Sequence, residues 1–414
     1  MFTSFSTALS ALNADSTAID VVGNNLANLN TTGYKTNVVS FHDLVSQSLG
    51  YGLGSAQLGF GVGPPSTLRE FVQGSLQTTS GPLDAAIQGD GFFVVTGGTG
   101  NTEYTRAGNF QVDKNGFLVA ATGEKVQGWT LANGVLNTNA PPSDVVVPVG
   151  TISAPVPTKS LSFDINLNAA ATAGPPPDTF SSSVKTFDSL GQAHVVTVNF
   201  TKNTVAGKWD YSVTVPDADL KTAFTPVTGS LTFDSSGKLA TPLVTDPAPP
   251  IAITGFADGA ADMTINWNLY NGTSPRMTQF GQASAVSAVA QDGAAASQLI
   301  RVGVGDGGKI LAQYSNGQQQ VVGQLAMALV RNPDSLVTVG NNNYQVTGDT
   351  AAPAIGIPGT GGRGTVSGGS LEASTVDIAR EFTNLIVFQR GYQANSKVIT
   401  TVDQLSQDTI ALKV

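Results

Sequence analysis

The sequence predicts a mainly β protein with long α-helical termini, in which nested antiparallel β domains lie between an N-terminal and a C-terminal helix. Three observations carry this prediction. Apolar residues recur at helical spacing at both ends, apolar and polar residues alternate through the middle, and the strand–helix alternation of doubly wound α/β enzymes is missing. With 414 residues the chain is also too long for one core, since single cores stop growing near ~250–300 residues.

The first predicted element is a helix from Phe2 to Leu29. Its apolar residues recur at spacings of three, four or seven, and small polar residues and Ala fill the positions between them. The stripe consists of Phe5, Leu9, Leu12, Ile19 and Leu26. A helix with one apolar side cannot bury that side alone, so this stripe must pack on another surface.

A longer helix is predicted at the C-terminus. Ser374-Thr375-Val376-Asp377 has the pattern of a capping box, with Ser374 as the N-cap, and no proline occurs from Leu371 to Val414. The apolar stripe that follows consists of Ile378, Phe382, Leu385, Phe388, Tyr392, Ile399, Val402 and Leu405. Helical stripes usually pack on the core of their own domain. Here that packing is less favoured, because the two helices lie at opposite ends of the chain and the sequence between them is typical of β structure.

The middle of the chain alternates between apolar and polar residues, as half-buried strands do. Three clear runs are Leu161–Leu167, Trp209–Val215 and Met263–Leu269. One apolar face per strand is typical of antiparallel sheets. Lys114-Asn115-Gly116 predicts a type I′ hairpin turn, and Gly303–Gly308 a glycine-rich turn and no nucleotide site, because a strand and no helix follows it.

Proline and glycine clusters mark the expected domain borders. The predicted divisions are a terminal helical domain of residues 1–30 plus 370–414, a linker of 31–70 plus 356–369, a first β domain of 71–147 plus 283–355, and an inserted outer β domain of 148–282. The linker contains the glycine-rich stretch Gly50–Gly63, which we expect to be a loop or hinge.

The composition leaves little material for catalysis. The chain has no cysteine and two histidines, His42 and His194, and we expect His194 at a strand edge or surface. We therefore predict no enzyme, no metal and no cofactor. A net charge of −9 disfavours nucleic acid, the apolar runs are too short for membrane insertion, and the N-terminus does not resemble a cleaved secretory signal.

Four segments match known sequence signatures and not only a periodic pattern of apolar residues. Asn24–Lys35 resembles the N-terminal signature of bacterial flagellar rod and hook proteins, Gly74–Phe93 and Tyr104–Phe110 resemble the blocks that follow it, and Gln389–Lys397 resembles the C-terminal signature of that family. The matches occur in the family's order and cover both ends and the first β domain. The length of the chain and the additional β domain at 148–282 favour a hook subunit over the shorter distal rod subunit.

The resemblance implies a structural subunit that polymerises helically into a flexible curved tube, a universal joint between rod and filament. It implies terminal helices that pair as a coiled coil lining the tube, and an extracellular location reached by type III export without a cleaved signal peptide. The implied partners are further copies of the chain, the rod and hook–filament junction proteins, the hook cap and the flagellar type III export apparatus.

The same resemblance suggests a set of contact residues in the N-terminal signature. Beside the two helical stripes, the expected subunit interface includes Asn24, Asn25, Asn28, Thr31, Gly33, Tyr34 and Lys35. A compatible interpretation of this segment is a helix end and turn, with Gly33 in the left-handed conformation and the asparagines as caps. The alternatives are a distal rod protein of the same family and, from another class, a secreted β-rich adhesin or binding module. The adhesin predicts a pocket lined with aromatic residues, yet only 7% of the residues are aromatic and none cluster on a loop.

Overall fold

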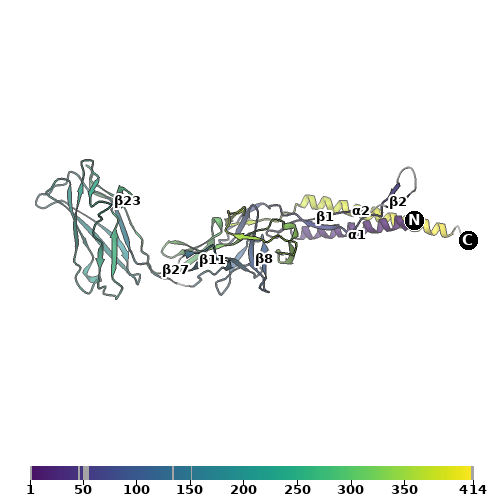
Figure 1. Cartoon of the computed structure of the whole chain (residues 1–414), viewed down its shortest axis with the longest axis horizontal. Helices are drawn as coiled ribbons and strands as arrows, with labels where there is room; N and C mark the ends of the chain where they lie inside the picture. Colours follow the sequence, from purple (N-terminus) through teal and green to yellow (C-terminus); the bar gives the residue numbers. More distant parts are fainter. Residues whose placement is uncertain (1, 45–46, 50–55, 133–134, 151, 412–414) are drawn as a thin grey trace. The chain divides into compact units, whose positions relative to one another are not determined.

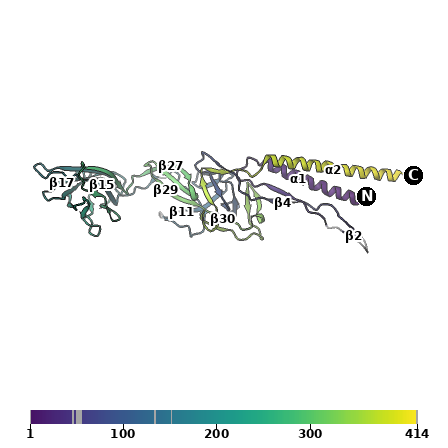
Figure 2. The same cartoon turned by 90° about the horizontal axis from the view of Figure 1, so that it is seen from above.

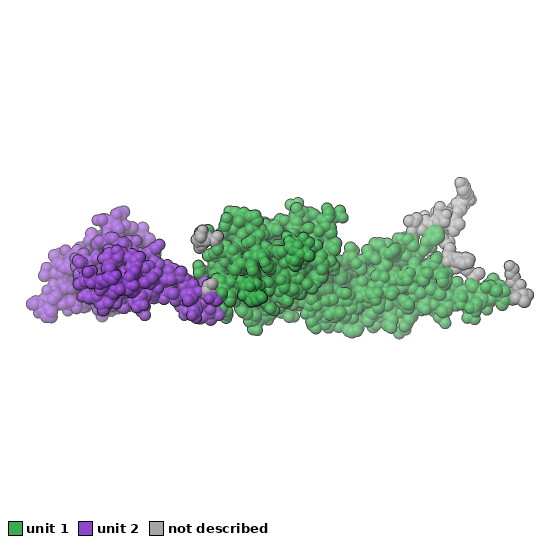
Figure 3. Space-filling view, turned by 90° about the horizontal axis from the view of Figure 1, so that it is seen from below, with its two compact units in different colours: residues 1–149, 301–313, 319–414 green, residues 150–300, 314–318 purple. Residues whose placement is uncertain are grey.

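The computed structural model describes residues 2–44, 47–49, 56–132, 135–150 and 152–411. The chain forms two compact units (Figure 3). Unit 1 comprises Met1–Val149, Arg301–Gln313 and Gln319–Val414, and unit 2 comprises Gly150–Ile300 and Tyr314–Gln318. The predicted class, mainly β with helical termini, is confirmed, since the α-helices among the described residues occur only near the two ends of the chain.

Unit 1 contains both helices, α1 (Phe2–Ala27) and α2 (Ile378–Ala411). They lie side by side and run in opposite directions, so that the first turn of α1 and the last turns of α2 point the same way (Figures 1 and 2). The predicted cap of α2 was wrong. The Asp377 carboxylate, and not Ser374, caps the helix, because its Oδ1 accepts hydrogen bonds from the backbone N–H groups of Ala379 and Arg380 at 2.8 and 3.2 Å.

Small residues let the two helices approach closely. Ala14, Ala18 and Val22 of α1 are buried. A Cβ atom on Gly391 of α2 would lie 3.0 Å from the Asp15 carboxylate, and Asn395 donates a hydrogen bond to that carboxylate at 3.1 Å. No described helix combines the length and the apolar character needed to cross a membrane.

The β part of unit 1 is built on one long sheet in the order β27–β28–β29–β11–β7–β8–β32–β31. Its elements are β5 (Leu76–Thr78), β6 (Ala85–Gln88), β7 (Phe92–Thr96), β8 (Thr102–Thr105), β9 (Phe110–Val112), β10 (Leu118–Ala120), β11 (Lys125–Ala132), β12 (Val135–Leu136), β13 (Ser143–Asp144), β27 (Ser297–Val304), η2 (Asp306–Gly308), β28 (Lys309–Tyr314), β29 (Gln319–Leu325), β30 (Met327–Leu329), η3 (Pro333–Ser335), β31 (Val337–Gly340), β32 (Asn343–Gln345), β33 (Ala354–Gly356), β34 (Thr365–Gly368) and β35 (Ser370–Glu372). Two cores flank this sheet, one around Phe93 and Leu118 and the other around Phe92 and Tyr344.

The predicted linker is more ordered than its glycine content suggested. In the first half, β1 (Asn37–Ser40) pairs antiparallel with β4 (Ser66–Arg69), and β2 (Gln47–Leu49) pairs with β3 (Ala56–Leu58). The described part is therefore an antiparallel ribbon, while residues 50–55 of the predicted loop lie outside the described residues. In the second half, β34 pairs with β6. Strand pairing satisfies the backbone N–H and C=O groups of these glycine-rich segments, although a loop was expected there.

Two turn predictions have different outcomes. The turn at Lys114–Gly116 is present, but only Gly116 has a positive φ, and the Asp113 carboxylate accepts the backbone N–H of Asn115 and Phe117, so it is not type I′. The segment Gly303–Gly308 is confirmed as a turn, because its residues 305–308, with the short η2, link the end of β27 to β28.

Unit 2 is a sandwich of two sheets, visible in Figure 1 in the teal to green part of the chain. Its elements are β14 (Ile152–Ser153), β15 (Ser160–Asn166), β16 (Thr179–Phe187), β17 (Ala193–Lys202), β18 (Lys208–Thr214), η1 (Asp217–Asp219), β19 (Val227–Phe233), β20 (Leu239–Thr241), β21 (Ile251–Ile253), β22 (Met263–Trp267), β23 (Tyr270–Asn271), β24 (Ser274–Pro275), β25 (Met277–Thr278) and β26 (Ala285–Gln291). Phe163 and Ile265 from one sheet and Phe200 and Trp209 from the other share one core. One sheet is antiparallel throughout, but β15 pairs parallel with β22 and β25, which strand periodicity cannot reveal.

The inserted domain extends beyond the predicted range of 148–282. β26 pairs antiparallel with β15 over its whole length, and the compact unit continues to Ile300. The proline at Ser274-Pro275 was interpreted as a border, but it lies in a short strand pair, after which the chain returns to the same sheet. A border placed at residue 282 would remove an edge strand from the sandwich.

His194 is buried in unit 2, against the expectation of a surface position. Its Nε2 lies 3.0 Å from the Asp188 carboxylate and its Nδ1 lies 3.0 Å from that of Asp219. Burial lowers the His194 pKa, but the contacts with the two carboxylates outweigh burial and raise it above its ordinary value. Burial likewise raises the Asp188 pKa, yet the hydrogen bonds that this carboxylate accepts hold the value below the ordinary one.

These shifts predict how the stability of unit 2 depends on pH. A raised His194 pKa stabilises the fold below the unfolded value of 6.5, and this contribution is lost as the pH rises through the folded pKa. A lowered Asp188 pKa stabilises it above 3.8, and this is lost as the pH falls through the folded pKa. Unit 2 should therefore resist urea best from about pH 4 to about pH 6.5 and weaken at alkaline pH.

Tryptophan fluorescence in a Trp129→Phe background can follow this transition, because Trp209 and Trp267 then report unit 2 alone. His194→Gln should remove most of the alkaline decline. A decline of equal size in the variant would show that other groups cause it.

Candidate assembly site

The Asn24–Lys35 segment folds back on the end of α1 by side-chain hydrogen bonds. The Tyr34 hydroxyl lies 2.9 and 3.2 Å from the side-chain oxygens of Asn24 and Asn25. The amide of Asn25 also bonds to the backbone of Asn37 in both directions, at 2.8 and 3.1 Å. Burial raises the pKa of Tyr34, so its hydroxyl stays protonated at neutral pH. These bonds fix the direction in which the chain leaves the helix.

Gly33 allows this segment to pass close to the first β domain. Its φ is +68°, its N–H donates to the Glu372 carbonyl at 2.8 Å, and a Cβ atom would lie 2.6 Å from the Arg106 carbonyl carbon. Only glycine adopts this conformation without cost and fits this space.

Gly33→Ala should therefore destabilise unit 1. The left-handed conformation alone costs ~1–2 kcal/mol for a residue with a Cβ, and the backbone contact adds to it. Gly23→Ala is the matched control, since Gly23 lies in α1 with nothing within 4 Å of a Cβ, and alanine there should stabilise the helix by about 0.5–1 kcal/mol. Urea unfolding measures both. Equal stability of Gly33→Ala and the parent chain would contradict the steric argument.

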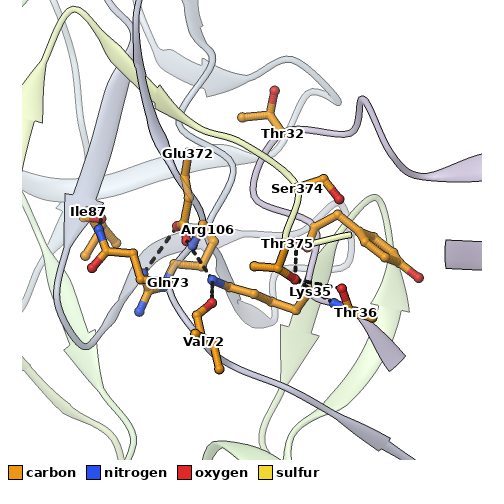
Figure 4. Close-up of polar contacts among 12 residues, drawn as sticks. Thr32, Lys35, Thr36, Val72, Gln73, Ile87, Arg106, Glu372, Ser374 and Thr375 are labelled. Atoms are coloured by element: carbon orange, nitrogen blue, oxygen red, sulfur yellow. Dashed lines mark hydrogen bonds and ion pairs between the residues drawn. The ribbon is translucent and has the colours of Figure 1, made fainter. Parts of the chain in front are cut away.

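A buried charge cluster follows this glycine (Figure 4). The Lys35 ammonium lies 2.6 Å from Glu372 Oε1 and donates to the Val72 carbonyl at 2.5 Å. Arg106 Nη1 lies 3.3 Å from Glu372 Oε2. The side chains of Lys35 and Glu372 are both 0% exposed, and Arg106 is 4% exposed. One carboxylate therefore joins two cations from distant parts of the sequence.

Further hydrogen bonds support these charges, although the buried Arg106 Nε has no hydrogen-bond partner among the described residues. The Gly74 N–H donates to Glu372 Oε1 at 2.8 Å, and Arg106 donates to the Gly89 carbonyl at 2.9 Å. Burial lowers the Lys35 pKa more than the nearby Glu372 raises it. The cluster thus costs desolvation and is held because each charge has partners.

The start of α2 joins the same structure. Thr36 N–H donates to Thr375 Oγ1 at 2.9 Å (Figure 4). Thr375 N–H donates to the Tyr34 carbonyl at 3.1 Å. Lys35 follows α1 and Glu372 precedes α2. The C-terminal end of α1 and the N-terminal end of α2 are therefore anchored to one point of the first β domain. The geometry can carry force between the helices and the β domain, but it presents no reactive group to solvent.

This cluster changes the role expected for the N-terminal signature. Asn25, Gly33, Tyr34 and Lys35, which were predicted as subunit contacts, are buried within the chain. Asn24 is exposed, and Asn28 and Thr31 are partly exposed. The buried residues hold the fold together, and only the accessible ones can meet a neighbour.

The predicted helical stripes divide into two sets. Phe5, Leu9, Ile378, Phe382, Tyr392 and Leu405 are exposed, whereas Leu12, Ile19, Leu26, Leu385, Phe388, Ile399 and Val402 are partly buried. On α2 the partly buried positions recur every three or four residues, and α1 packs along α2, so we infer that this set faces α1. The described part of the chain leaves the side chains of the exposed set open to solvent.

The exposed surface of α2 is larger than the sequence indicated. Ile386, Val387, Val398 and Ile410 join it, with Ile386 and Val387 exposed by 57% and 59%. Glu381 is the only described residue of α2 that the chain buries. These exposed apolar residues lie on both sides of the strip inferred to face α1, and their number on a 34-residue helix marks an interaction surface, called here the exposed apolar face of α2.

Glu372 and Arg106 were not among the site residues predicted from the sequence. Arg106 lies inside a segment recognised by resemblance, but without a stated role. Glu372 is the single charged residue between Arg363 and Asp377, and such an isolated carboxylate in a neutral stretch is the signal that could have identified it.

Four family models match the chain in succession. The flagella basal body rod protein model matches residues 5–35, and the flagellar hook protein FlgE/F/G D1 domain matches 86–169. The flagellar basal body protein FlaE D2 domain matches 163–294, and the flagellar basal body rod FlgEFG protein C-terminal model matches 367–412. The D2 match lies within unit 2 and includes β26.

Full-length relatives agree. The chain is 33% identical to the flagellar hook protein FlgE of Borreliella burgdorferi, covering 100% of both chains, and 32% identical to that of Escherichia coli K12, covering 99% of this chain and 100% of the relative. The crystal structure of Helicobacter pylori FlgE2 aligns with a TM-score of 0.53 at 14% identity, over 70% of this chain and 99% of that one, and shows a similar fold. By its ordered domain matches and its identity to these relatives along the whole chain, the protein belongs to the flagellar hook protein FlgE family.

Proposed function

We propose that copies of this chain, a structural subunit of the flagellar hook, polymerise head to tail into a curved helical tube. The observation that carries the proposal is the exposed apolar face of α2, which the described chain leaves uncovered. A head-to-tail contact, in which two different surfaces of identical subunits meet and the rotation does not close a ring, generates an open helical polymer. The polymer would then bury the face that the monomer exposes.

In this proposal α1 and α2 form a coiled coil that lines the tube, and the β units lie outside it. The spacing of Phe5, Leu12, Ile19 and Leu26 by seven and the close packing of α1 on α2 support this. The Lys35–Glu372–Arg106 cluster would transmit torque from the helical layer to the first β domain, because it anchors the C-terminal end of α1 and the N-terminal end of α2.

The proposed tube bends as it rotates, so contacts between outer units must form and break in each turn. Only 12% of the residues are charged, and small neutral polar residues are abundant. Neutral hydrogen bonds exchange with water at small net cost, which suits sliding contacts.

The proposed partners are the rod, the hook–filament junction proteins, the hook cap and the type III export apparatus. We propose export to the cell exterior without cleavage of the N-terminus. Phe5 and Leu9 belong to the proposed assembly surface, and cleavage in this region would remove them. The role is mechanical, with no catalytic step.

Immunogold electron microscopy of isolated hook–basal bodies tests the proposal, with an antibody raised against residues 150–300. We expect label along the short curved segment outside the envelope. Label confined to the straight rod would favour the distal rod alternative, and a complete lack of label would favour a binding module elsewhere.

A further inference from the structure

A polar pocket of about 700 Å³ lies in unit 1 between the end of α1, the β1–β4 ribbon and the β31–β32 hairpin. Asparagine and threonine side chains make up most of its lining. Asn24, Asn28 and Thr31, the accessible residues of the N-terminal signature, form one wall, and Asn341 and Asn342 of the hairpin belong to another. Amides and hydroxyls offer both donors and acceptors, so the pocket suits a polar peptide segment.

Arg69 is the only charged residue among those that line the pocket. Its guanidinium carbon lies 5.2 Å from the centroid of the Tyr344 ring, which holds the side chain in place. Burial raises the pKa of Tyr344 to about 12, so the ring beneath the cation is neutral. The stacked guanidinium is fixed in position, but its charge is not compensated by this contact.

Within the described residues, the Arg69 guanidinium forms no ion pair with a carboxylate and donates no hydrogen bond. Two carboxylates that contact asparagines of the lining are engaged by those asparagines. Glu124 accepts a hydrogen bond from Asn341 at 2.9 Å, and Glu103 accepts one from Asn343 at 2.9 Å. By contrast, Arg106 and Arg276 each contact a carboxylate of their own chain. A fixed, half-buried guanidinium with unused donors is a recognition element for a carboxylate.

We propose that this pocket receives a carboxylate side chain from a second copy of the chain, with Arg69 as its cation and the asparagines as hydrogen-bond partners of the segment that bears it. The inference deepens the proposed function and rests on it. A second copy is the occupant that charge complementarity favours, since the chain has 29 acidic against 20 basic residues and a net charge of −9.

The first test is the critical concentration for polymerisation of the purified full-length chain, measured by sedimentation. Arg69→Gln should raise it roughly tenfold or more, since a hydrogen bond to a charged group is lost at every contact. Arg331→Gln, at an exposed arginine outside the pocket, makes the same change in net charge and should leave it unchanged. An equal effect of both variants, or none from Arg69→Gln, would overturn the inference.

The second test identifies the partner. Arg69→Lys keeps the cation and supplies an amine, which a carbodiimide can couple to an adjacent carboxylate as an amide with loss of water. Polymers are assembled from an equal mixture of ¹⁵N-labelled and unlabelled chains and then cross-linked. Mass spectrometry should find peptides that join the introduced lysine to an Asp or Glu of a differently labelled copy. A cross-link only within one chain, or no cross-link at that lysine, would overturn the inference.

These outcomes separate the two proposals. If the parent chain forms no polymer, the proposed function fails. If the parent polymerises and the Arg69 variants behave as their controls, the hook assignment stands and the pocket is not a subunit contact.

Discussion

Ile386→Asp should abolish polymerisation and leave the monomer folded. Ile386 is 57% exposed on α2, so the substitution removes little packing from the single chain. In the polymer it would lose ~1.5–3 kcal/mol of apolar burial and place an unpaired carboxylate in an apolar contact. A total above about 4 kcal/mol raises the critical concentration roughly a thousandfold. Sedimentation measures assembly, and circular dichroism measures the fold of the monomer.

Ile386→Leu is the matched control, because it keeps the apolar volume and should polymerise nearly as the parent does. Leu385 is a less decisive target, because it is partly buried and lies in the set inferred to face α1. Polymers of normal yield from Ile386→Asp would remove α2 from the proposed subunit contact.

Glu372→Ala should destabilise unit 1 by about 3–5 kcal/mol, because it leaves Lys35 and Arg106 buried without their shared carboxylate. The Gly74 N–H would lose its acceptor as well. The C-terminal end of α1 and the N-terminal end of α2 should then detach first, which limited proteolysis would reveal as early cleavage near residues 35 and 372. Urea unfolding followed by circular dichroism gives the change in free energy.

Lys125→Ala is the comparison for this second prediction. Lys125 pairs with Asp144 at 2.8 Å, but its side chain is 42% exposed, so the loss should stay below about 1 kcal/mol. A similarly small effect of Glu372→Ala would mean that water or rearranged neighbours compensate the two cations, and the cluster would not be the anchor we infer.

The sequence was sufficient for features that depend on local spacing. The stripe through Phe5, Leu12 and Ile19 predicted α1, and the alternation from Trp209 to Val215 predicted β18, because both patterns follow directly from backbone geometry. The capping residue of a helix is harder to predict from local spacing. Ser374 and Asp377 are both good cap residues, and only the path of the chain selects Asp377.

Contacts between residues far apart in the sequence cannot be predicted from local spacing. Lys35 and Glu372 are separated by 337 positions, and no periodicity links them. The N-terminal signature was therefore assigned to the subunit surface, although Lys35 and Tyr34 are buried in the chain. His194 was misplaced for the same reason, since Asp219 reaches it from a separate 3₁₀ turn.

The most direct test of the α2 interface uses the fact that the chain has no cysteine. Ile386→Cys places a single thiol on the exposed face of α2, and Ser235→Cys places one on an exposed turn of unit 2 as a reference. The rate of maleimide labelling is measured in the monomer and in the polymer. We expect rapid labelling of both thiols in the monomer, and in the polymer protection at position 386 while position 235 still reacts. Equal labelling of position 386 in the two states would contradict the central claim that the hook assembles by burying this face.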